Sequence, residues 1–227
     1  MARLHSKGVL PMENVIIDTD FLSHILKTPN GEAVMQKIAD FYGYNFVMHP
    51  WVYEREIKNI HTDVDSFVQR KVTVLEYEDF IKSEEDDMIY EFIFKVLHEE
   101  MNRGRPVDPG YQSYRTYNRS GMNLGEIHSV IMSRFTGIPL LLSDDHNAKE
   151  IAARRINADG YLLDVKKSFD IMCDIVKTDK SILPKEDTFA VIRNYKPEYQ
   201  KARLKEIKEL YTSDPMPVDG MGKGVKL

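Results

Sequence analysis

The sequence predicts an α/β protein whose parallel sheet of about five strands is sandwiched between helices. Five short apolar runs, mostly unbroken rather than alternating, are typical of strands buried on both faces. They are Val15–Ile17, Asn45–Met48, Val72–Leu75, Ile138–Leu142 and Gly160–Leu163. Segments with helical spacing of apolar residues separate them. Because strand–helix–strand connections are nearly always right-handed crossovers, this order predicts a parallel sheet with helices on both faces.

The composition indicates a globular, reducing-compartment protein. The chain has 227 residues, of which 42% are hydrophobic and 30% are charged, enough for one large domain with its own core. Its one cysteine, Cys173, excludes an internal disulfide or a cysteine zinc cluster. An apolar stretch long enough to span a bilayer is missing, so we expect a cytoplasmic protein without a membrane contact.

The pattern changes along the chain predict three parts. Residues 12–178 carry the alternating strands and helices, with a Gly- and Pro-rich insertion at about 100–123. Residues 179–212 form a basic helical extension whose apolar side chains we expect to pack on that domain. Residues 213–227 lack a packing pattern and are expected to be disordered.

The clearest helix is expected over residues 84–100. Four acidic residues open it, which suits the positive end of the helix dipole. Its apolar residues recur at helical spacing and predict one buried stripe: Met88, Ile89, Phe92, Ile93, Val96 and Leu97.

Carboxylates follow the first and fourth expected strands. Asp18 comes directly after Val15–Ile17 and is followed by Thr19 and Asp20. A buried carboxylate there needs a hydrogen bond, a partner or a metal, but Asp18 or Asp20 also suits a helix N-cap. Asp144 and Asp145 follow the fourth strand after Ser143. Adjacent acids raise each other's proton affinity unless they share a cation, so a metal is the favoured interpretation there.

Two further acidic residues open the helices that follow. Glu56 lies on an apolar line with Val52 and Ile60 after Pro50, although a surface helix with Arg55 and Lys58 as counter-charges explains it equally well. Glu126 begins another helix, where Asn123 and Glu126 also fit a capping box. Taken singly, the capping box is the better explanation of Glu126.

Together these acids favour a metal site. Asp18, Glu56, Glu126 and the pair Asp144 and Asp145 all map to the edge where parallel strands end, which is where such sheets bind ligands. A group of carboxylates with few basic partners is the oxygen-rich environment that Mg²⁺ or Mn²⁺ requires. Two such ions, about 4 Å apart, can activate water and stabilise a leaving 3′-oxygen in phosphodiester hydrolysis.

The order of these motifs resembles that of the PIN-domain nucleases over roughly residues 14–176. The similarity rests on Asp18-Thr19 after a strand, Pro50 to Glu56-Ile57, Gly125-Glu126 opening a helix, and Ser143-x-Asp145 closing a strand. The resemblance implies a PIN-like three-layer fold and a metal-dependent endoribonuclease acting on single-stranded or structured RNA. Family members often work in toxin–antitoxin or RNA-processing settings, so an inhibitor protein and a homo-oligomer are implied partners.

The resemblance and the clustering assign roles to individual residues. Asp18, Glu56, Glu126 and Asp145 are the expected catalytic carboxylates, and the expected metal ligands are Asp18, Glu126, Asp144 and Asp145. Thr19, Asp20 and Ser143 are expected to contact and orient these ligands rather than to bind the metal. Ser143-x-Asp145 matches the family spacing better than Asp144 does. His128 and His146 are expected not to bind metal, since His128 lies two residues from Glu126 and faces away from it.

The insertion is the candidate RNA contact. Guanidinium groups can pair with phosphates and tyrosines can stack on unpaired bases, so the expected contacts are Arg103, Arg105, Tyr111, Tyr114, Arg115, Tyr117 and Arg119. The alternative, at near-equal odds, is a solvated loop whose tyrosines lie on the core.

Two other functions remain open. A haloacid-dehalogenase-like phosphatase is suggested by Asp18-Thr19-Asp20, but it leaves Glu56 and Glu126 without a role and has Leu22 where Thr or Val is usual. A PIN-fold RNA- or protein-binding module that has lost catalysis is the other. Cleavage of RNA only with Mg²⁺ or Mn²⁺ distinguishes the nuclease from both.

Overall fold

A five-stranded parallel sheet forms the centre of the protein. The computed structural model describes residues 12–58, 62–119, 122–151 and 162–213. The strands are β1 (Glu13–Ile17), β2 (Tyr44–Met48), β3 (Thr73–Val74), β4 (Leu140–Leu142) and β5 (Asp164–Lys166), arranged in the order β3-β2-β1-β4-β5. All four pairings between neighbouring strands are parallel. The predicted α/β class is therefore confirmed.

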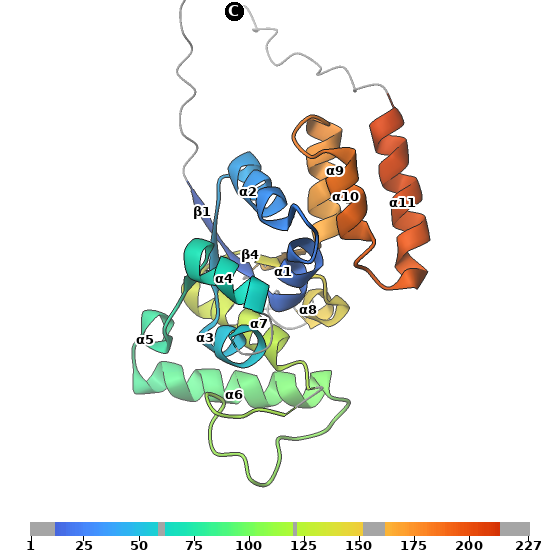
Figure 1. Ribbon diagram of the computed structural model, residues 1–227. Coiled ribbons are helices and arrows are strands. Elements are labelled where there is room, and N and C mark those ends of the chain that lie inside the picture. Colours follow the sequence, from blue (N-terminus) through green and yellow to red (C-terminus); the bar gives the residue numbers. More distant parts are fainter. Residues whose placement is uncertain (1–11, 59–61, 120–121, 152–161, 214–227) are drawn as a thin grey trace, which may run out of the picture.

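Helices cover both faces of this sheet (Figure 1). On one side lie α1 (Thr19–Leu26), α2 (Gly31–Tyr42), α4 (Thr62–Lys71) and α9 (Ser168–Thr178), which pack on one another through α1. On the other side α7 (Leu124–Thr136) packs on β1 and β4. It is surrounded by α3 (Pro50–Val52), α5 (Tyr77–Phe80), α6 (Glu84–Met101) and α8 (His146–Ile151). The interior strand residues, such as Ile16, Val47 and Leu141, are fully buried between these layers.

The strand order places a crevice at the carboxyl ends of β1 and β4. From β1 the chain proceeds outward to β2 and β3, then crosses back to β4 on the other side of β1. Such a reversal separates the loops that follow the two neighbouring strands, and ligands bind there in open α/β sheets. The residues that follow β1 and β4 are Asp18 and Ser143 to Asp145. The fold thus brings two of the acidic motifs together.

Two elements differ from the sequence prediction. The fifth strand was expected at Gly160–Leu163, but β5 begins at Asp164, and the first two residues of the expected strand lie outside the described part. In α6 the predicted stripe is buried only in part. Leu97 is buried and Ile93 and Val96 are half-buried, but Met88, Ile89 and Phe92 are 72%, 41% and 68% exposed. Tyr90 and Phe94, which the spacing did not predict, are buried.

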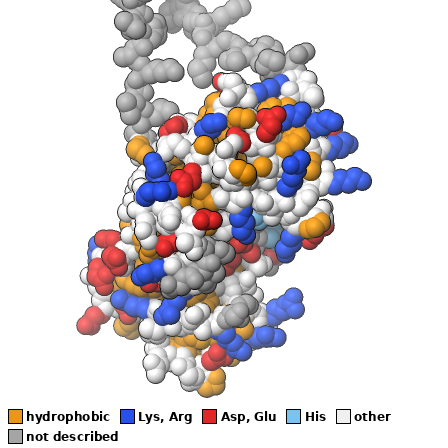
Figure 2. All heavy atoms as spheres, in the orientation of Figure 1, with side chains coloured by type: hydrophobic (Ala, Val, Ile, Leu, Met, Phe, Trp, Pro, Cys, Tyr) orange, Lys and Arg blue, Asp and Glu red, His pale blue; other side chains and the backbone are white. Residues whose placement is uncertain are grey.

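The C-terminal helices pack on the α/β domain. They are α10 (Lys185–Ile192), which contacts α1 and α2, and α11 (Pro197–Thr212), which contacts α9 and α10. Ile192 and Ile207 are fully buried, as their spacing predicts. Figure 2 shows Lys and Arg side chains along the right edge of the view over these helices, with acidic side chains among them. The tail expected to be disordered lies outside the described residues, apart from Ser213.

In the described ranges, none of the helices combines the length and apolar character needed to cross a bilayer.

Candidate metal centre

Three carboxylates converge at the carboxyl edge of the sheet. Asp20 comes from the first turn of α1, Glu126 from the first turn of α7, and Asp145 from the residue before α8. One oxygen of each lies within 4.8 Å of the others. Glu126 and Asp145 are half-buried and Asp20 is exposed, so the group opens to solvent on one side. Carboxylate oxygens gathered in this way are the hard ligands that Mg²⁺ and Mn²⁺ prefer.

Asp18 lies beneath this group rather than in it. Its side chain is the N-cap of α1: Oδ1 accepts a hydrogen bond from the Thr19 amide at 2.8 Å, and Oδ2 accepts one from the Ser143 hydroxyl at 3.0 Å. Asp18 is 2% exposed. These contacts join the ends of β1 and β4. Helix capping therefore accounts for the position of Asp18, and the Ser143 hydroxyl holds its second carboxylate oxygen.

Asp20 was expected to support the metal ligands, and its carboxylate oxygen is one of the three that converge. Because Asp18 occupies the N-cap, Asp20 falls at the second position of α1 and points out of the helix end. The pattern Asp-x-Asp after a strand is a signal for this arrangement, because its first Asp can cap the helix while its second Asp, two residues later, lies in the first turn.

Glu56 is held against the group by a change in helix geometry. Residues Tyr53–Ile57 form a π-helical turn, η1, in which the amide of Lys58 donates to the carbonyl of Tyr53. Single π turns of this kind redirect a side chain and are common at functional sites. The Thr19 hydroxyl donates to Glu56 Oε2 at 2.6 Å. Glu56 thus connects the second acidic motif to the first, as the sequence predicts.

Gly125 makes room for Glu56 at the start of α7. A Cβ atom at position 125 would lie 2.5 Å from Glu56 Oε1 and 2.9 Å from Oε2, far inside contact distance. The Gly-Glu motif therefore has a steric explanation: the glycine lets one carboxylate approach the helix on which the next one sits. The predicted capping box is absent, because the Asn123 side chain makes no cap hydrogen bond.

Burial and mutual repulsion favour protonation of these acids when no cation is bound. Desolvation first, and then the charges of Asp145, Glu56 and Asp20, raise the pKa of Glu126 to about 8. Desolvation also raises the pKa of Asp20, Glu56 and Asp18. In the described segments, the ion pairs of Lys58, Arg70, Lys95, Arg115, Arg119 and Lys205 go to other acids. A divalent cation is the partner this group suits, since it stabilises the ionised carboxylates together.

Asp144 was expected to bind metal, but it is placed differently from its neighbour and is not among the three converging carboxylates. Its side chain is 1% exposed and receives four hydrogen bonds. Oδ1 accepts from the Ser168 amide and the Tyr195 hydroxyl, both at 3.0 Å. Oδ2 contacts His24 Nδ1 at 2.6 Å and accepts from the Ser168 hydroxyl at 2.7 Å. With both oxygens occupied by protein donors, Asp144 is a buried structural carboxylate, and Asp145 alone of the pair faces the group.

A second buried polar cluster lies behind α7. The Tyr90 hydroxyl contacts His49 Nε2 at 3.0 Å and His128 Nδ1 at 2.8 Å, while His49 Nδ1 accepts from the Trp51 amide at 3.0 Å. This order makes His49 Nε2 a donor to Tyr90, which in turn donates to His128. Desolvation lowers the pKa of both histidines, that of His128 to about 3. His128 therefore faces away from the carboxylates, as its position predicts, and His146 is exposed at the surface.

The tyrosines of the insertion pack against the core. Tyr114 is 1% and Tyr117 9% exposed, so neither offers a face for stacking on bases. Tyr111 is half-buried, and its hydroxyl donates to Glu91. Arg115 pairs with Asp87 and Arg119 with Asp108. The solvated-loop alternative thus fits these residues better than RNA contact does.

Arg103 and Arg105 differ from the other arginines of the insertion. Both are exposed, and neither forms an ion pair with a residue in the described ranges. They are the part of the expected RNA contact that the structure leaves accessible.

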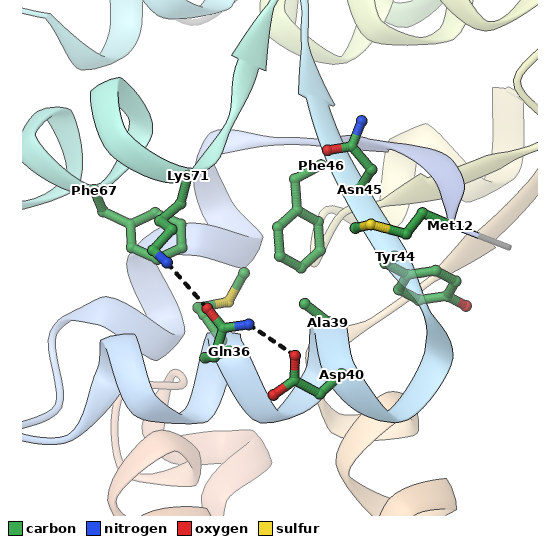
Figure 3. Close-up of a pocket in the computed structure, with 10 residues that line it drawn as sticks. Met12, Gln36, Ala39, Asp40, Tyr44, Asn45, Phe46, Phe67 and Lys71 are labelled. Atoms are coloured by element: carbon green, nitrogen blue, oxygen red, sulfur yellow. Dashed lines mark hydrogen bonds between the residues drawn. The ribbon is translucent and has the colours of Figure 1, made fainter. Parts of the chain in front are cut away.

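A pocket elsewhere on the sheet is separate from the carboxylates. It has a volume of about 190 Å³ and is lined by Met12, Phe46 and Phe67 together with residues of α2 (Figure 3). Lys71, Gln36 and Asp40 form a hydrogen-bonded chain at its rim. Met12 precedes β1, and Tyr44 and Asn45 begin β2, so the pocket lies at the amino ends of the strands. It is therefore at the opposite edge from the three converging carboxylates.

Comparison with known proteins adds no family to this description. No protein-family model, no curated protein and no solved structure matches the chain.

Proposed function

We propose that the protein is a divalent-metal-dependent endoribonuclease that hydrolyses phosphodiester bonds at the carboxyl edge of its sheet. The observation that supports this most is the convergence of Asp20, Glu126 and Asp145 within 4.8 Å. They come from three segments that are far apart in the chain. Burial raises the pKa of Asp20 and that of Glu126, the latter to about 8, as expected of carboxylates that suit a cation.

Asp20, Glu126 and Asp145 would hold the metal ion, Mg²⁺ or Mn²⁺. When bound, such an ion lowers the pKa of water and stabilises charge on a phosphoryl oxygen. Glu56 lies beside the group, hydrogen-bonded to Thr19, and has the position of a base for the attacking water. Asp18 and Ser143 fix the helix end from which Asp20 projects.

The choice of RNA as substrate rests on the resemblance to PIN-domain nucleases, with exposed Arg103 and Arg105 as candidate phosphate contacts. An inhibitor protein and a homo-oligomer belong to the same proposal. The burial of Asp18 argues against the phosphatase alternative. A nucleophile needs an accessible oxygen, but both Asp18 oxygens accept protein hydrogen bonds and the residue is 2% exposed.

The test measures cleavage of a single-stranded RNA pool with Mg²⁺, with Mn²⁺ and with EDTA. We expect cleavage only with metal, and a loss of at least about 100-fold in Glu126→Gln and in Asp145→Asn. Asp170→Asn is the matched control, since Asp170 is exposed on α9 and is not one of the converging carboxylates.

Binding of Mn²⁺ by calorimetry is the second measurement. It should be lost in Glu126→Gln and Asp145→Asn and kept in Asp170→Asn. Cleavage in EDTA, or equal activity in all variants, would contradict the proposal. Metal binding without cleavage of RNA would instead favour the non-catalytic binding module.

A further inference from the structure

A histidine beside the carboxylates is held in one orientation by a set of buried contacts. His24 lies one turn after Asp20 on α1, and its Nδ1 is 2.6 Å from Asp144 Oδ2. Asp144 is the neighbour of Asp145 in sequence. The pair His24 and Asp144 therefore bridges the two segments that supply Asp20 and Asp145. Desolvation raises the pKa of Asp20, and the charge of His24 offsets part of that rise. The imidazole lies at the border of the proposed metal centre.

The contacts determine which nitrogen remains available. A carboxylate accepts hydrogen bonds, so Nδ1 is the nitrogen that donates to Asp144. The His24 ring also packs on the Tyr195 ring, with 4.4 Å between the two centroids. The Arg203 guanidinium in turn lies 3.7 Å from the centroid of the Tyr195 ring. Nε2 is left, and it makes no hydrogen bond to any residue in the described ranges. The His24 side chain is 23% exposed, and Nε2 is not among the buried polar atoms without a partner in the described residues, so this nitrogen reaches solvent.

The surroundings of Asp144 support a functional role for this orientation. Four donors converge on the Asp144 carboxylate, from α1, from α9 and from the segment between α10 and α11. A carboxylate that only links two helices needs one or two hydrogen bonds. A carboxylate that orients an imidazole through Nδ1 is the arrangement by which enzymes present Nε2 to a reacting group.

We propose that His24 is the general acid that protonates the leaving 3′-oxygen, with Asp144 and Tyr195 as its positioning residues. This inference rests on the proposed function. When water attacks phosphorus, its oxygen forms a new bond to phosphorus and its proton passes to Glu56, while the bond from phosphorus to the 3′-oxygen breaks and its electron pair passes to that oxygen. The oxygen takes the proton from Nε2, giving a 3′-hydroxyl and a 5′-phosphate, and Nε2 regains a proton from solvent. General acid catalysis of this kind contributes about 10²- to 10⁴-fold.

The sharpest variant is His24→Asn. The asparagine Nδ2 takes the place of imidazole Nδ1, so the contact with Asp144 is kept while Nε2 is removed. His146→Gln is the matched control, because His146 is exposed at the start of α8 and is the nearest other histidine in the sequence to the acidic motifs. The substrate is an RNA oligonucleotide with a mapped wild-type cleavage position. It is compared with the same oligonucleotide carrying sulfur in place of the bridging 3′-oxygen there.

A thiolate leaves without a proton, so the two substrates separate proton donation from every structural effect. We expect His24→Asn to cleave the oxygen linkage about 10²- to 10⁴-fold more slowly than wild type and the sulfur linkage less than tenfold more slowly. Wild type and His146→Gln should cleave both. The Mn²⁺-induced rise in melting temperature should be the same in all three proteins.

Other outcomes would overturn the inference in distinguishable ways. An equal loss on both linkages, or loss of the Mn²⁺-induced shift, would make His24 a purely structural residue while the nuclease proposal stands. Selective loss on the oxygen linkage in His146→Gln would assign the proton donor to His146. If wild type cleaves neither linkage with Mg²⁺ or Mn²⁺, the proposed function fails and this inference falls with it.

Discussion

Single residues at the sheet edge have roles that depend on their exact neighbours. Asp18 and Asp20 are two residues apart, yet one is a buried helix cap and the other an outward carboxylate. Asp144 and Asp145 are adjacent, yet one is enclosed by four donors and the other faces the group. The sequence predicts that acids gather here, because strand ends are recognisable from apolar runs. It does not predict which member of each pair points outward, since that depends on donors such as Tyr195, distant in the chain.

Gly125 provides a test at this scale. In Gly125→Ala the new methyl group would meet the Glu56 carboxylate at 2.5 Å, so Glu56 must move and lose its bond to Thr19. We expect RNA cleavage to fall about 10- to 100-fold, as when groups that orient a metal site are displaced. The protein should stay folded, because Gly→Ala in a helix otherwise gains about 0.5–1 kcal/mol.

The control for this prediction is Gly125→Ala combined with Glu56→Asp. The shorter side chain relieves the clash, so the double variant should recover part of the activity lost in Gly125→Ala. Full activity in Gly125→Ala itself would show that the position of Glu56 is unimportant.

At the scale of elements, α6 shows why helical periodicity alone does not identify the buried face. Its sequence offers two apolar stripes that share Leu97: the first continues through Met88, Ile89 and Phe92, and the second through Tyr90 and Phe94. The second is buried because Tyr90 reaches His49 and His128, and Tyr114 of the insertion stacks on Tyr90 at 4.3 Å. These partners lie up to 41 residues away, so periodicity cannot reveal them.

Two phenylalanines of α6 test this assignment. Phe94→Ala removes a fully buried ring and should lower the free energy of unfolding by about 3–5 kcal/mol. Phe92→Ala, on the face that was first expected to be buried, should change it by less than about 0.5 kcal/mol. Chemical denaturation of both variants provides the measurement. Comparable losses in the two would mean that the exposed stripe is covered in solution.

At the scale of the whole molecule, the two buried polar clusters act on stability in opposite pH ranges. His49 and His128 are held neutral, with pKa values below the usual 6.5, so the unfolded chain binds more protons as pH falls below about 6.5 and stability drops. The carboxylates behave in the reverse sense. Glu126 has a pKa of about 8 against an ordinary 4.5, so its protonated form contributes stability below 4.5 that is lost as pH rises through 8.

This difference predicts how metal changes the pH profile. In EDTA, the free energy of unfolding should be highest between about pH 5 and 6.5 and decrease toward pH 8.5, by up to about 1.4 kcal/mol per pH unit for each proton released. Mn²⁺ should raise the melting temperature more at pH 8 than at pH 5, because protons compete for the same oxygens. Glu126→Gln should flatten the alkaline side in EDTA. A profile in EDTA that is identical for wild type and Glu126→Gln would contradict this account.

Tyr195 has a consequence for how the chain can be divided. It lies beyond residue 178, where the alternating pattern of strands and helices ends, yet its hydroxyl bonds Asp144 and the Phe169 amide, and its ring supports His24. A truncation at that boundary would leave a fragment with every strand intact but with a buried acid missing a donor. The chain beyond residue 178 is therefore part of the smallest unit that can be expressed with the contacts of Asp144 complete.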